Sequence, residues 1–301
     1  MNKEDNFISA VVYVRNEAEF IAPFFGELYE QLDAYFSHFE IIAVNDASTD
    51  SSHESLKAVS LGWKQPLTIV NMNIYRGREE CMNAGLDLTI GDFVYEFDSV
   101  REKFPVNLIY ESYQCALTGM DAVSVCPKKQ AVSSKLFYAI FNVSSDVANK
   151  IRSEAFHLIS RRLIHRMRAV SDYAAYRKAG IAACGLKVHR IIYDGKMRTA
   201  QYGKMKLAVD SLLLYTQAGY RVSLCISLLN IILIIVGMLY TVIVYFMGVP
   251  MEGWTTTCLF LLIGFAGIAI LATIIIKYLD LLLKLCLKRQ YLVENIEKYP
   301  R

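Results

Sequence analysis

Two long uncharged runs near the C-terminal end constrain this chain more than any other feature. No charged residue stands between Arg221 and Glu252, and the run 253–276 that follows is also free of charge. Each run exceeds the about 20 apolar residues that a helix needs to cross a bilayer. A short turn at Gly248-Val249-Pro250 separates them. We therefore predict two transmembrane helices joined by this turn, because buried helices of soluble proteins rarely lack charge over such lengths.

Basic residues flank this pair of runs on both sides. They are Lys204, Lys206 and Arg221 before the first run, and Lys277, Lys284, Lys288 and Arg289 after the second. Only Glu252 is charged in the loop between the runs. Because loops rich in Lys and Arg stay on the cytoplasmic side, we predict a multi-pass protein with both ends in the cytoplasm.

The overall composition fits such a mixture of membrane and globular segments. Of the 301 residues, 54% are hydrophobic and 20% are charged, against about 45–50% and 25% in soluble domains. A net charge of +3 without a basic block argues against nucleic acid as a partner. The seven cysteines form no Cys-x-x-Cys pair, which is typical of reduced thiols and not of a disulfide framework or zinc site. We also expect no signal peptide at the N-terminus.

Strand-like and helix-like segments alternate over the first 130 residues. The strand-like segments, rich in β-branched residues, are 7–14, 40–46, 67–72 and 92–98. The segments with helical periodicity are 16–36, 52–61 and 78–88. This alternation predicts an α/β fold, with an open, mostly parallel sheet and helices on both faces.

Polar residues gather where three of these strands end, at 15–17, 45–50 and 98–99. The carboxyl ends of parallel strands meet at one edge of the sheet, which is where such folds bind ligands. A single cluster is most often a helix cap or a turn. Three clusters at successive strand ends favour a binding site, whose carboxylates and amides suit a base, a ribose and, through a divalent ion, a diphosphate.

Several motifs carry a family resemblance. They are VVYVRNEAEFI, EIIAVNDASTDSS, RGREECMNAGLDLTIGDFVYEFDS, SKLFYAIFN, FHLISRRLI, Arg198 with Lys204, and the tail GWTTTCLFLLIGFAGIAILATIIIKYLDLLLK with KRQYLVE. In this order they resemble the family 2 glycosyltransferases, which have a GT-A fold. The whole chain is more narrowly similar to the membrane-anchored polyprenyl-phosphate group of bactoprenol glucosyltransferases and dolichol-phosphate mannose synthases.

The resemblance implies transfer of a sugar from a nucleoside-diphosphate sugar to a polyprenyl phosphate, undecaprenyl phosphate in a bacterium, at the inner membrane. It implies a nucleotide-sugar site of Asn16, Glu17, Asp46, Ser48, Asp50, Arg78 and Asp98. It implies catalytic roles for Asp98, Glu154 and Arg161, with Mg²⁺ or Mn²⁺ at Asp98. The implied ligands of the lipid phosphate are Arg161, Arg162, Arg198 and Lys204.

The same resemblance divides the chain into parts. Residues 1–130 are the nucleotide-sugar-binding core, and 131–220 complete the catalytic domain. The transmembrane helices occupy 221–284, and 285–301 form a cytoplasmic tail. Within the second part, 133–147 is expected as an interfacial helix that presents Leu136, Phe137, Ile140 and Phe141 on one side.

Three positions depart from the family pattern. Val100 replaces the second aspartate of the Asp-x-Asp motif, Asn45 replaces the first aspartate of Asp-Asp-Gly-Ser, and Ala155 replaces the aspartate before the Arg-Arg segment. Two hypotheses follow: an active transferase with altered or no metal use, or a degenerate relative that serves as a partner of a flippase or polymerase. The resemblance further implies self-association and cooperation with a small membrane flippase.

Overall fold

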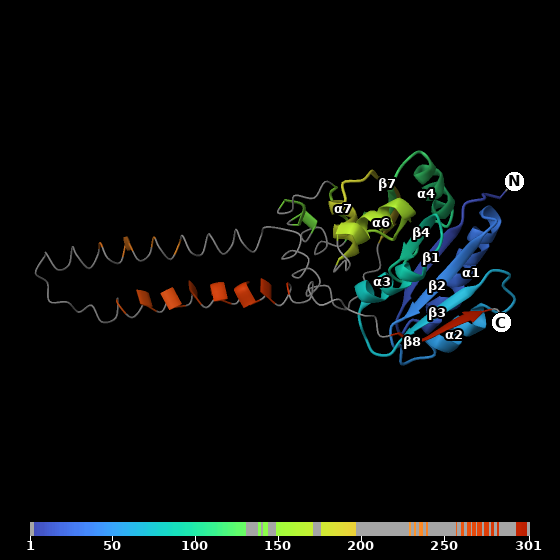
Figure 1. The fold of residues 1–301 in the computed structure, drawn as a ribbon, viewed down its shortest axis with the longest axis horizontal. Helices are drawn as coiled ribbons and strands as arrows, with labels where there is room; N and C mark the ends of the chain where they lie inside the picture. The colour runs from blue at the N-terminus through green and yellow to red at the C-terminus, as the bar shows by residue number, and fades with distance from the viewer. Residues whose placement is uncertain are drawn as a thin grey trace, which may run out of the picture. The chain divides into compact units, whose positions relative to one another are not determined.

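The computed structural model divides the chain into two compact units (Figure 1). The first unit comprises Met1–Ala208 and Arg289–Arg301, and the second comprises Val209–Lys288. The structure describes residues 3–130, 138–139, 141–143, 149–170, 176–196 and 293–299, together with scattered residues between 229 and 282.

The first unit is built on a mixed sheet, which has eight strands among the described residues. Their order is β7-β5-β6-β4-β1-β2-β3-β8. All run in one direction except β6, which lies antiparallel between β4 and β5, and β8, which lies antiparallel on β3. The strands are β1 Ile8–Val14, β2 Phe39–Asn45, β3 Leu67–Met72, β4 Phe93–Phe97, β5 Ala122–Lys129, β6 Phe156–Ser160, β7 Val188–Lys196 and β8 Val293–Tyr299.

Helices cover both faces of this sheet (Figure 1). One face packs against α1, α2 and α4, and the other packs against α3, α6 and α7. The helices are α1 Ala18–Tyr35, α2 Ser52–Val59, α3 Arg78–Leu88, α4 Leu108–Leu117, α6 Arg161–Val170 and α7 Arg177–Ala183. The result is a three-layer α/β arrangement, with one hydrophobic core above the sheet and another below it.

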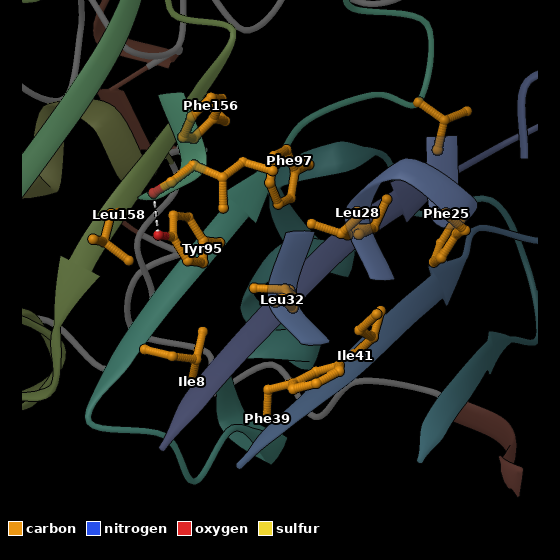
Figure 2. Packing of buried hydrophobic residues seen from close by; sticks show 14 of the residues in the cluster. Ile8, Phe25, Leu28, Leu32, Phe39, Ile41, Tyr95, Phe97, Phe156 and Leu158 are labelled. Atoms are coloured by element: carbon orange, nitrogen blue, oxygen red, sulfur yellow. Dashed lines mark hydrogen bonds between the residues drawn. The ribbon is translucent and has the colours of Figure 1, made fainter. Parts of the chain in front are cut away.

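The alternation of side chains along a strand supplies both cores. In β4, Tyr95 and Phe97 join the core beneath α1 and α4, whereas Val94 joins the core beneath α3 and α6. Figure 2 shows Tyr95 and Phe97 packed near Leu28 of α1, and Tyr95 donates a hydrogen bond of 2.5 Å to the carbonyl of Ile109. Because successive residues of a strand point to opposite faces, Glu96 and Asp98 fall on the α3 side.

The sheet confirms the α/β expectation for the first hundred residues. Each predicted strand and helix is present, with ends that differ by a few residues from those expected. The C-terminal residues differ from the expectation. Residues 293–299, expected as part of a cytoplasmic tail, form β8 and extend the sheet at β3. Glu297 of β8 lies 2.9 Å from Lys57 of α2, which adds an ion pair at this new edge.

In the part of the chain that the structure describes, no helix is both long enough and apolar enough to cross a membrane. The predicted spans at 221–284 lie mostly outside the described residues. Of the predicted interfacial face, Leu136, Phe137 and Ile140 also lie outside them, and Phe141 is buried.

Candidate functional site

The turns after β1 and β2 are joined at the carboxyl edge of the sheet, the edge where β1, β2 and β4 end. Asn16 and Ala47 both adopt a left-handed backbone with φ of 49°, which is rare for residues other than glycine. The Asn16 side-chain oxygen accepts a hydrogen bond of 2.8 Å from the Thr49 N–H, and the Asn16 N–H donates to Ser48 Oγ at 3.1 Å. Such strained conformations persist where their surroundings hold them, often at functional sites.

Asp46 is a buried anchor for the loop that enters α3. Its carboxylate accepts hydrogen bonds from the N–H groups of Arg76 at 2.8 Å and Gly77 at 3.0 Å. The Tyr13 hydroxyl donates a third hydrogen bond at 2.9 Å, and burial together with the Asp46 charge raises the pKa of Tyr13. Asp46 therefore holds the loop before α3 in place, and its side chain is buried away from solvent.

Glu17 and Asp50 connect neighbouring loops at the same edge. Glu17 Oε1 lies 3.0 Å from Arg101 Nε, and burial raises the pKa of Glu17 against the opposing effect of that guanidinium. Asp50 accepts hydrogen bonds from the N–H groups of Ala18 at 3.2 Å and Ser52 at 3.1 Å, the first residues of α1 and α2. These hydrogen bonds lower the pKa of Asp50 although burial opposes them.

Asp98, directly after β4, is surrounded by positive side chains. Its Oδ1 accepts a hydrogen bond of 2.7 Å from Arg177 Nη2. Its Oδ2 lies 3.5 Å from Lys178 Nζ and 3.8 Å from Arg78 Nε. Burial alone would raise the pKa of Asp98, but the Arg78, Lys178 and Arg177 charges outweigh it and hold that pKa well below its usual range.

These groups belong to a larger buried network, which we call the charge cluster. Its members are Arg78, Glu79, Glu96, Asp98, Glu154, His157, Arg177 and Lys178. Arg177 is fully buried and also contacts Glu79 at 3.0 Å and Glu96 at 3.1 Å. A buried charge is stable only when it is paired, and the cluster balances four carboxylates against three basic side chains and a protonated His157.

His157 lies between two carboxylates of the charge cluster. Its Nε2 is 2.5 Å from Glu96 Oε2, and its Nδ1 is 3.3 Å from Glu154 Oε2. Burial would lower the pKa of His157, but the two carboxylates raise it to about 10. The imidazole is therefore positively charged at neutral pH, which completes the balance of charge.

The structure brings together only part of the predicted site. Asp98, Arg78 and Glu154 meet in the charge cluster, since Lys178 Nζ lies 3.8 Å from Glu154 Oε2. Asn16, Glu17, Asp46, Ser48 and Asp50 order the neighbouring turns.

The predicted phosphate-binding arginines lie elsewhere. Arg161 follows β6, whose end pairs with the start of β4, so it lies at the edge opposite Asp98. There its guanidinium donates to the Gly91 carbonyl at 2.6 and 2.9 Å. Arg162 is bound to Asp121 at the same opposite edge. The structure does not bring either arginine to Asp98, and Arg198 and Lys204 lie outside the described residues.

Sequence reasoning missed Arg177, Lys178, His157 and Glu96. One signal was present, because Glu96 and His157 interrupt segments that otherwise read as buried strands. A charge inside a buried strand requires a partner of opposite charge. The partners themselves stand about 80 residues away, as with Arg177 and Glu96 at a separation of 81.

Part of the chain is similar to a known protein family. Residues 9–99 match the model of Glycosyl transferase family 2. An uncharacterized glycosyltransferase of Synechocystis is 24% identical over 64% of this chain and 62% of its own length. The bactoprenol glucosyl transferase of Shigella phage SfX is 27% identical over 65% of this chain and 66% of its own length. The chain thus spans about two thirds or less of these relatives.

Solved structures agree on the fold. A mannosyltransferase from Pyrobaculum calidifontis, PcManGT, in complex with GDP-Man and Mn²⁺, superposes with a TM-score of 0.52 at 20% identity, over 70% of this chain and 63% of that one. The mixed sheet with flanking helices is therefore GT-A-like. Residues 9–99 match a glycosyl transferase family 2 domain, which agrees with the resemblance found in the sequence and supports a transferase.

Proposed function

We propose that the protein is a glycosyltransferase that moves a sugar from a nucleoside-diphosphate sugar to a polyprenyl phosphate. One observation carries the proposal: Asn16, Asp46 and Asp98 follow the adjacent parallel strands β1, β2 and β4 and converge at one edge of a family 2 domain. That edge is where open parallel sheets bind their ligands. Relatives named bactoprenol glucosyl transferase support a lipid-phosphate acceptor.

The reaction needs little proton transfer. A phosphate oxygen of the lipid attacks the anomeric carbon of the sugar and forms a new carbon–oxygen bond. The bond from that carbon to the diphosphate breaks, and the nucleoside diphosphate leaves with the electron pair. Because the nucleophile is already an anion, rate comes from holding the two reactants in line and from positive charge beside the leaving group.

We also propose that Val209–Lys288 holds two transmembrane helices that anchor the protein in the bacterial inner membrane. Many described side chains of this unit are apolar and exposed, among them Leu239, Phe265 and Ile276 at 57%, 66% and 65%. Exposed apolar surface of this kind marks an interaction or membrane site. A membrane anchor suits a lipid substrate, and Arg198 and Lys204 remain candidates for the phosphate of that substrate.

Transfer is tested with the full chain in detergent, undecaprenyl phosphate and a panel of labelled UDP- and GDP-sugars, each with EDTA, Mg²⁺ or Mn²⁺. The expected result is label in the organic phase that depends on both the protein and the lipid phosphate. Absence of transfer from every donor under every condition contradicts the proposal.

Asp98→Asn tests the centre of the site in the same assay. Loss of this charge unbalances Arg177 and Lys178, so we expect transfer to fall by about 100-fold, the scale for losing one preorganised charged group. Asp33→Asn is the matched control, because Asp33 is exposed on α1 and pairs only with Lys3 among the described residues. Full activity of Asp98→Asn would remove Asp98 from the site.

A second candidate, a binding partner without catalysis, is favoured by one observation. Both oxygens of Asp98 are engaged by basic side chains of the protein itself. A carboxylate held in this way is less available to a substrate or metal ion. Nucleotide binding without sugar transfer in the assay above would favour this candidate, which we would then place beside a flippase or polymerase.

A further inference from the structure

A divalent cation beside Asp98 is the group that the fold family implies, and the residues present do not fit it. Mg²⁺ and Mn²⁺ prefer several oxygen ligands in near-octahedral geometry. Asp98 supplies one carboxylate, whereas Val100, two residues further on, is buried and apolar. Within the described parts of the chain, no group of three or more His, Cys, Asp or Glu side chains is arranged to hold a metal ion.

The charge around Asp98 also opposes a dication. Arg177 bonds one carboxylate oxygen at 2.7 Å, and Lys178 lies 3.5 Å from the other. Arg78 approaches that second oxygen to 3.8 Å. A metal ion at Asp98 would have to displace the basic side chains that already engage both carboxylate oxygens, and each of them would repel it in a buried setting where charges are poorly screened.

Two of these three cations are paired less closely within the protein than Arg177 is. The Arg78 side chain is 28% exposed, and its Nε is buried without a hydrogen-bond partner in the structure. Lys178 Nζ lies 3.5 and 3.8 Å from Asp98 and Glu154, which is at or beyond hydrogen-bond range. Arg177 differs, because its guanidinium is enclosed by Glu79, Glu96 and Asp98 and faces no solvent.

We propose that Arg78 and Lys178 hold the donor's diphosphate without a divalent metal ion, and that Arg177 is a positioning residue that fixes Asp98 between them. The inference rests on the proposed function, since it describes how the same site binds its donor. A guanidinium and an ammonium group both bind phosphate oxygens through charge-assisted hydrogen bonds. Their positive charge also stabilises the diphosphate as it leaves.

Calorimetry on the full chain in detergent tests this, with UDP and GDP titrated in EDTA and again in Mn²⁺. We expect the better-binding nucleotide to have the same affinity in both buffers to within about twofold. An affinity that Mn²⁺ raises by about tenfold or more overturns the inference and leaves the proposed function standing. Absence of binding by either nucleotide in either buffer instead overturns the proposed function together with the inference.

Variants then separate phosphate binding from folding. Arg78→Gln and Lys178→Gln are each expected to weaken binding of the nucleoside diphosphate by about tenfold or more and to leave binding of the matching nucleoside unchanged. Lys178→Arg should retain binding, and Lys64→Gln, at an exposed site after α2, is the control. If both Gln variants bind the diphosphate as the wild type does, or lose nucleoside and diphosphate binding alike, the two cations are structural and the inference is wrong.

Discussion

His157 links the charge cluster to pH at the scale of a single residue. Its pKa is raised to about 10 in the folded protein by Glu96 and Glu154, against about 6.5 for an unfolded histidine. A raised pKa stabilises the folded state fully below pH 6.5, and this stabilisation is lost as pH rises toward 10. The folded form therefore binds the proton that holds two buried carboxylates together.

We expect the thermal midpoint of the wild type to fall between pH 7 and pH 10. His157→Gln should lose about 3–5 kcal/mol near neutral pH, the usual cost of removing one partner from a buried ion pair. Its midpoint should also fall less steeply over the same interval, because the titrating group is gone. Thermal unfolding of both proteins across this pH range checks the prediction, and parallel pH profiles would show that His157 does not carry the effect.

Asp46 and Asn16 show, also at the scale of single residues, that a sequence motif does not by itself identify which atoms a side chain contacts. The resemblance implies that both bind the donor, and the structure gives both of them backbone N–H partners within the protein. A motif identifies the loop that carries the polar residues. It does not say whether each residue orders the turn or contacts a ligand, because the same residue types serve both purposes. Their spacing in the sequence does not distinguish the two roles.

At the scale of elements, α3 lies close against the sheet through Gly85. A Cβ at this position would lie 2.8 Å from Cγ2 of Val44 on β2, and closer still to Cγ1 of Val11 on β1. Both valines are fully buried, so the core has no free space for another methyl group. Since α3 begins with Arg78, this close packing also positions one cation of the charge cluster.

Gly85→Ala is therefore expected to destabilise the protein by about 1–3 kcal/mol through overpacking. The matched control is Gly26→Ala in α1, where a Cβ meets nothing within 4 Å. That control should gain about 0.5–1 kcal/mol, because alanine favours the helix interior over glycine. Thermal or denaturant unfolding compares the two, and equal stability of Gly85→Ala and wild type would contradict the packing argument.

At the scale of the whole molecule, the chain leaves the first unit after Ala208 and returns to it at Arg289. The return is secured by β8, which pairs with β3 along most of its length. A segment that leaves a folded unit and comes back to it crosses any membrane an even number of times. Two spans in Val209–Lys288 satisfy this requirement, and one or three do not.

Tags at the two ends of the chain test this topology in bacterial cells. Because β1, near the start of the chain, and β8, near its end, belong to the same sheet, we expect both tags to be protected from protease added to spheroplasts and cleaved after lysis. A periplasmic marker cleaved before lysis is the control for access. Cleavage of one tag alone in intact spheroplasts would contradict either the β3–β8 pairing or the even number of spans.

The sequence by itself determined the order of strands and helices over the first hundred residues, the two-sided sheet and the family 2 resemblance, because periodicity and turn residues are local properties of a chain. It also placed Asp98 at the edge of the sheet. Only the tertiary structure decided what surrounds that carboxylate, since Arg177 lies 79 residues from Asp98 and no local pattern records their pairing. The same long-range packing placed Arg161 at the opposite edge and joined the tail to β3. Contacts between distant segments form because the apolar side chains on both faces of the sheet must be buried together. This burial depends on the whole fold and not on any local segment.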